Sequence, residues 1–131
     1  MKNYFYLIKH KESGQALVTL LFFMIFAITT TASAVTVIIV NSLAASKFDQ
    51  GNYTYNVAES GAENALLKLL RDPNYPGETM TIDSATAIIQ VSGTNPKIIT
   101  SQGKIDSFSR TIQVTADYTN NILTIQSWKE I

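Results

Sequence analysis

The stretch KHKESGQALVTLLFFMIFA, from Lys9 to Ala27, decides the fold class. Its charged side chains all precede Gly14, and no ionised side chain follows until Lys47. A helix that crosses a bilayer needs about 20 consecutive, mostly apolar residues. The uncharged run from Ser13 to Ser46 is longer than that. The run therefore predicts a membrane-spanning helix.

The charges on the two sides of this run predict its orientation. Three lysines and one glutamate precede the run, whereas Lys47 and Asp49 cancel each other on the far side. Lysine and arginine are enriched on the cytoplasmic flank of membrane helices. We therefore expect a single-pass protein of the cell membrane, with its N-terminus in the cytoplasm and its C-terminal part extracellular or periplasmic.

Composition sets limits on what the rest of the chain can be. The chain has 131 residues, a formal net charge of zero and no cysteine. Beyond the apolar run about 85 residues remain, which is enough for one small self-folding domain. A net charge of zero implies no bulk attraction to nucleic acid, so no nucleic-acid partner is expected. The absence of cysteine excludes disulfides, thiolate metal sites and cysteine nucleophiles.

A second apolar pattern continues the helix beyond the uncharged run. Apolar residues from Gln50 onward recur at spacings of three and four, which is typical of an amphipathic helix. The stripe expected to face the core is Ala58, Ala62, Leu66, Leu69 and Leu70. The helix should end at Asp72, because the residue before a proline, here Pro73, is disfavoured in the helical conformation. Gly51 and Gly61 each weaken a helix by about 1 kcal/mol, which predicts flexibility near them.

The apolar period changes from 3.6 to 2 after the loop that starts at Pro73. TAIIQVS, KIITSQGKI and RTIQVTADY alternate apolar and polar residues as strands do. A hairpin should follow, because Asn120 and Asn121 tolerate the positive φ of tight turns. The short connections require antiparallel pairing. The apolar face that we expect to cover the helix stripe consists of Ile89, Val91, Ile112, Val114, Leu123 and Ile125.

These patterns together predict an α+β fold. A long N-terminal helix, membrane-spanning in its first half and amphipathic in its second, should pack on a C-terminal four-stranded antiparallel sheet. The amphipathic half, 47–72, and the sheet region, 73–131, should form one globular domain outside the membrane.

The layout of the chain resembles that of a type IV pilin-like protein, most similar to the PilX-type minor pilins. The resemblance rests on a basic leader ending in glycine, on the opening QALVTLLFF, and on AESGAENALLKLL in the second half of the helix. It implies a leader peptide of residues 1–14, a membrane and filament-core segment of residues 15–46, and a sheet exposed outside. A membrane peptidase would cut after Gly14, which makes Gln15 the mature N-terminus. Implied partners are other pilin subunits, the prepilin peptidase and, before assembly, membrane lipid.

Thr19 departs from the family pattern. Members of the family usually carry a glutamate at the fifth mature position, where its charge attracts the N-terminal amine of a neighbouring subunit. Here the fifth position is Thr19, whose hydroxyl supplies no charge and can bond within its own helix, as those of Thr29, Thr30 and Thr31 can. The resemblance therefore indicates a minor or tip structural subunit of a type IV pilus or related filament, not the major, polymer-forming one.

Two other interpretations stay open at the level of sequence. The small residues Ala32 and Ala34 fit a secretory signal that is cleaved after Ala34, although the apolar character continues from Val35 to Val40. The chain would then be a secreted binding module for an external ligand. An uncut helix would make it a membrane-anchored one.

Residue types suited to catalysis are sparse, and we expect neither an enzyme nor a cofactor. His10, the single histidine, lies in the leader. Glu59 and Glu63 stand one helical turn apart without a third metal ligand, which is typical of a solvated face, and Ser60 has no partner base. Charges at Lys97, Lys104 and Arg110 are expected to serve solubility. Tyr118 and Trp128 are expected to fill the core.

Overall fold

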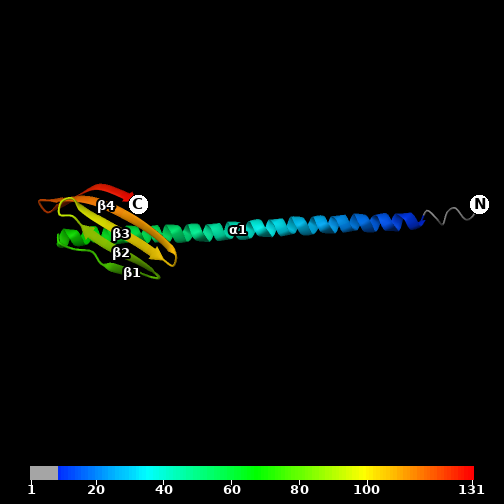
Figure 1. The fold of residues 1–131 in the computed structure, drawn as a ribbon, viewed down its shortest axis with the longest axis horizontal. Coiled ribbons are helices and arrows are strands. Elements are labelled where there is room, and N and C mark those ends of the chain that lie inside the picture. The colour runs from blue at the N-terminus through cyan, green and yellow to red at the C-terminus, as the bar shows by residue number, and fades with distance from the viewer. Residues whose placement is uncertain (1–8) are drawn as a thin grey trace, which may run out of the picture. The chain divides into compact units, whose positions relative to one another are not determined.

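A computed structural model of the chain describes residues 9–131. Within these residues the structure has one helix and five strands: α1 (Lys9–Arg71), β1 (Thr79–Ile82), β2 (Ala85–Ser92), β3 (Lys97–Ile105), β4 (Phe108–Thr119) and β5 (Ile122–Glu130) (Figure 1). The chain divides into a unit that ends at Ala44 and a unit of Ala45–Ile131, which we call the globular unit. The predicted α+β class with one long N-terminal helix is confirmed.

The helix ends where the sequence predicts. Its last residue is Arg71, and the amide of Asp72 still donates to the Lys68 carbonyl at 2.8 Å. The Asp72 carboxylate then accepts from the Asn74 amide at 2.9 Å, a local turn that competes with further helix. Basic residues in the last turn, Lys68 and Arg71, also suit the negative end of the helix dipole.

The sheet is an antiparallel meander in the order β1-β2-β3-β4-β5. The predicted count of four strands is wrong by one, since β1 pairs with β2 through a turn in which Asp83 has φ of 50°. This strand is only four residues long, too short for its alternation to stand out. The predicted hairpin is confirmed, because Asn120 and Asn121 have φ of 55° and 62°.

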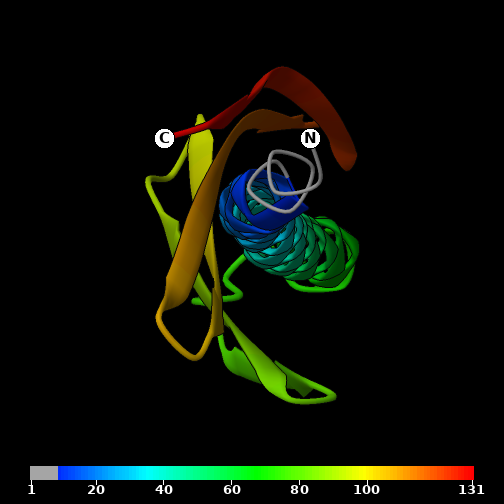
Figure 2. The same cartoon turned by 90° about the vertical axis from the view of Figure 1, so that its right-hand side faces the viewer.

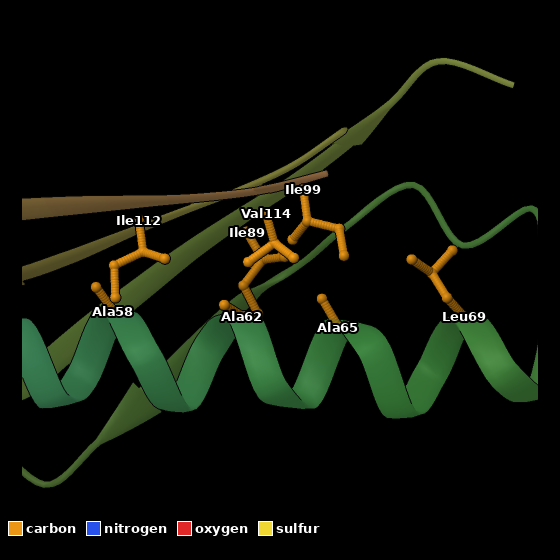
Figure 3. Close-up of a cluster of buried hydrophobic side chains, with 8 residues drawn as sticks. All are labelled: Ala58, Ala62, Ala65, Leu69, Ile89, Ile99, Ile112 and Val114. Carbon is orange, nitrogen blue, oxygen red and sulfur yellow. The ribbon is translucent and has the colours of Figure 1, made fainter. Parts of the chain in front are cut away.

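Small side chains dominate the contact between α1 and the sheet. Figure 3 shows the central cluster, in which the helix residues face side chains of β2, β3 and β4: Ala58, Ala62, Ala65 and Leu69 against Ile89, Ile99, Ile112 and Val114. The predicted stripe is correct at Ala58, Ala62 and Leu69, whereas Leu66 is only partly buried. It is wrong at Leu70, which is 51% exposed, and it missed Ala65, which is fully buried.

Two glycines set how closely the helix approaches the sheet. A Cβ on Gly103 of β3 would collide with the Thr54 carbonyl oxygen and lie 2.8 Å from the Ala58 nitrogen, both on the helix backbone. A Cβ on Gly61 would collide with the Ser101 hydroxyl and lie 3.0 Å from the Ala87 Cβ. Gly61 is therefore a packing residue within an unbroken helix, and alanines suffice to fill the narrow space between the layers.

The edge strand β5 contributes less to the core than the sequence predicts. Figure 2 shows the sheet curving around one side of the helix within the globular unit. Ile125 pairs with buried Ala116 and so shares its face, yet it is 49% exposed, so the prediction that it packs on the stripe is wrong. The reason is that β5 is an edge strand, outside the central cluster that α1, β2, β3 and β4 form. It also has a bulge opposite Thr115 and Ala116. Trp128 of β5 packs against the core cluster instead.

A polar cluster fixes the segment between α1 and β1 to the helix. Glu78 Oε1 accepts hydrogen bonds from Lys68 Nζ and, at 2.9 Å, from Asn64 Nδ2. The hydrogen bond from Lys68 is the main cause that lowers the pKa of Glu78. Burial, together with the charge of Glu78, raises the pKa of Tyr75 to about 12. Backbone hydrogen bonds from Ile89 to Glu78 and from Val91 to Pro76 hold the other side of the segment along β2.

Candidate functional site

The surface of α1 from Gly14 to Ala44 is apolar and fully accessible. Every residue in this range is exposed, and the large apolar side chains among them are each more than half exposed: Leu17, Val18, Leu20, Leu21, Phe22, Phe23, Met24, Ile25, Phe26, Ile28, Val35, Val37, Ile38, Ile39, Val40 and Leu43. The most apolar 18-residue window has a mean hydropathy of 2.2 and no buried residue. The helix is thus long enough and apolar enough to span a membrane.

The hydroxyl groups in this segment are satisfied by the helix itself. Thr19 Oγ1 donates to the Gln15 carbonyl at 2.9 Å. The same bond to a carbonyl one turn earlier is made by Thr29, Thr30, Thr31, Ser33 and Thr36. This confirms the predicted back-bonding. Because a polar group without a partner is costly in hydrocarbon, these bonds let the hydroxyls lie in an apolar environment.

The predicted processing and assembly residues, Gly14, Gln15 and Thr19, lie within about one and a half turns of α1. Gly14 and Gln15 are exposed and helical, and no atom outside the local helix lies within 4 Å of the place a Gly14 side chain would take. Thr19 is joined to Gln15 by its hydrogen bond, and both line a shallow hollow with Ala16, Leu20 and Phe23. Most of the predicted leader, and the side chain of His10, lie outside the described residues.

The other sequence candidates occupy structural positions. Glu63 is exposed and Glu59 half-buried, and in the part of the chain that the structure describes no three potential metal ligands gather in one place. The Ser60 hydroxyl donates to the Asn56 carbonyl at 2.8 Å. Tyr118 is half-buried. Trp128 packs against the core cluster, as predicted.

Sequence reasoning missed a hollow in the globular unit. Its walls come from the helix at Lys47, Phe48 and Gly51 and from the start of β4 at Phe108 and Arg110. The only signal in the sequence is Lys47, the first charge after the uncharged run. Nothing in the sequence pattern indicates that Arg110 lies beside it.

Comparison with protein-family models, with curated proteins and with solved structures finds no match to this chain.

Proposed function

We propose that the protein is a minor or tip structural subunit of a type IV pilus or a related filament. The observation that carries the proposal is the difference in environment between the two halves of α1. The helix is continuous from Lys9 to Arg71, its first half exposes apolar side chains all round, and its second half forms a core with a sheet. A soluble domain does not need such an extension, whereas a subunit that moves from a membrane into a helical filament core does.

Two successive environments would cover the apolar half. An exposed apolar surface of this extent is unstable in water, since each Å² costs about 25 cal/mol. Lipid would cover it before assembly, and the equivalent helices of other pilin subunits would cover it in the filament. Small residues and back-bonded hydroxyls along the segment, such as Ala27, Thr31 and Ala34, permit close helix packing in both environments.

Thr19 supports a minor role over that of the main repeating subunit. Its hydroxyl is already bonded to the Gln15 carbonyl, so Thr19 has no unpaired charge whose cost could be relieved by the amine of a neighbouring subunit. A subunit of this kind would be stable as a free membrane protein. It would enter a filament through apolar helix packing, beside glutamate-bearing partners.

Processing after Gly14 is the first test. Residues on both sides of Gly14 are helical, so a peptidase must unwind this turn, and glycine makes the unwinding easier by about 1 kcal/mol relative to alanine. Gly14→Val also places a branched side chain next to the scissile bond, where only a residue without a side chain lets the backbone lie flat in the peptidase site. It should therefore leave a full-length precursor in the membrane of cells that carry a prepilin peptidase. Intact-mass measurement should find the wild-type protein starting at Gln15.

Ala34→Val is the matched control, because it blocks a secretory signal cut after Ala34. We expect it to mature like the wild type. A mature protein that starts at Val35, or a Gly14→Val variant that is processed normally, would contradict the pilin assignment and favour a binding module.

Assembly is the second test. When the protein is expressed with a pilus assembly machinery and a glutamate-bearing major pilin, we expect it in sheared filaments at low copy number. Expressed with the machinery alone, it should stay in the membrane, because nothing draws a second copy onto the first. Electron microscopy and quantitative mass spectrometry of the sheared fraction provide the readout. Abundant fibres of this protein alone would refute the minor role.

A further inference from the structure

The hollow between α1 and β4, which the sequence does not predict, is lined by cations and aromatic rings. It measures about 350 Å³ and lies between α1 and the start of β4. Its helix wall is formed by Lys47, Phe48, Gly51 and Asn52, and its sheet wall by Phe108 and Arg110. None of its lining residues in the described chain is acidic. Such a site favours an anion.

Among the described residues, the two cations keep hydrogen-bonding capacity that the globular unit does not use. Arg110 Nε forms an ion pair with Glu130 Oε1 at 3.0 Å, and within the described residues the two terminal NH₂ groups of this guanidinium make no hydrogen bond. The Arg110 side chain is 45% exposed. Asp49, the nearest acid along the helix, lies about 200° around it from Lys47, because each residue turns an α-helix by about 100°. Its carboxylate therefore leaves the helix on another side.

The position of the hollow along the chain points to its ligand. The uncharged run of 34 residues is about 51 Å long as a helix. A bilayer with its headgroups is about 40–45 Å thick, so a tilt within the usual range of about 0–40° places Lys47, which directly follows the run, at the level of the lipid headgroups. Lysine at the end of a membrane helix extends its ammonium toward the phosphates. Phe48, which is 68% exposed, is suited to the boundary with the acyl chains. Phosphate groups are the most abundant anions at this level.

We infer that the hollow binds the phosphate of an anionic phospholipid from the membrane that holds the helix. The guanidinium of Arg110 would donate its free NH₂ groups to two phosphate oxygens, since its planar fork matches phosphate geometry. The ammonium of Lys47 would neutralise the remaining charge. The bound lipid would hold the start of β4 at the membrane surface. The inference depends on the helix being in a membrane but not on assembly into a filament.

The test is lipid binding to the full-length protein in detergent micelles, followed by native mass spectrometry as phosphatidylglycerol is added. A cation near an anionic membrane surface contributes about 1 kcal/mol, or roughly fivefold in affinity. The double variant Lys47→Gln with Arg110→Gln should therefore bind phosphatidylglycerol about 30-fold more weakly. The control, Lys97→Gln with Lys129→Gln, removes the same charge elsewhere on the sheet and should bind like the wild type. Equal weakening in both double variants would overturn the site.

A second variant changes affinity in the opposite direction. Glu130→Gln removes the carboxylate that competes for Arg110, so this variant should bind phosphatidylglycerol severalfold more tightly. Weaker binding by Glu130→Gln would contradict the proposed role of Arg110. Inorganic phosphate at equal concentration should not displace the lipid, because it lacks acyl chains to contact Phe48. Displacement would mean a site for free anions and would overturn the lipid assignment. Lipid binding without filament incorporation would leave this inference intact while refuting the pilus subunit.

Discussion

Gly103→Ala is expected to destabilise the globular unit by about 3 kcal/mol or more. Overpacking a core costs about 1–3 kcal/mol when side chains can adjust. Here the added methyl group would meet the Thr54 carbonyl oxygen and the Ala58 nitrogen, which belong to the backbone of a regular helix and cannot rotate away. The helix would have to move off β3, and the alanines in the contact would then leave gaps that no larger side chain fills.

Unfolding of the full-length protein in detergent can measure this effect through fluorescence. Trp128 is the single tryptophan of the chain and packs against the core cluster, so its emission reports the globular unit. The matched control is Gly51→Ala, for which nothing lies within 4 Å of the new Cβ. This helical substitution should stabilise the protein by up to about 1 kcal/mol. Similar melting of Gly103→Ala and the wild type would show that helix and sheet are less close than described.

Leu69→Ala is expected to cost about 2–5 kcal/mol, as truncation of buried leucines does. Leu69 is the largest helix side chain in the central cluster and is 1% exposed. It fills the end of the helix–sheet contact beyond Ala65 (Figure 3). The other helix residues of the cluster are alanines. No neighbouring alanine can fill the cavity that its removal creates.

The adjacent Leu70 provides the control for this prediction. Leu70→Ala makes the same chemical change one position along the helix, where the side chain is 51% exposed. Its cost should stay below about 1 kcal/mol, because little apolar area returns to water. Denaturation followed by Trp128 emission measures both variants. Equal losses of stability would mean that Leu70 also packs in the core, as the apolar spacing alone suggests.

The sequence predicts features that depend on neighbouring residues. The end of α1 before Pro73, the positive φ of Asn120 and Asn121, and the antiparallel order of the sheet all follow from local sterics or from short connections. The hydrogen bond from Thr19 to Gln15 is also local, since a helix brings a hydroxyl to the carbonyl one turn earlier. Most of the candidate assembly surface could therefore be derived from the uncharged run alone.

The tertiary structure alone decides how the layers meet. Spacing of three and four admits Leu70 to the apolar stripe as readily as Ala65, but the contact at Gly103 brings the helix so close to β3 that small residues are selected. The alternation of apolar residues along β5 likewise cannot show that this edge strand leaves Ile125 exposed. Lys47 and Arg110 line one hollow although they are far apart in sequence, because the meander returns the start of β4 to the helix. Such contacts depend on how the chain packs in three dimensions, and local preference carries no information about them.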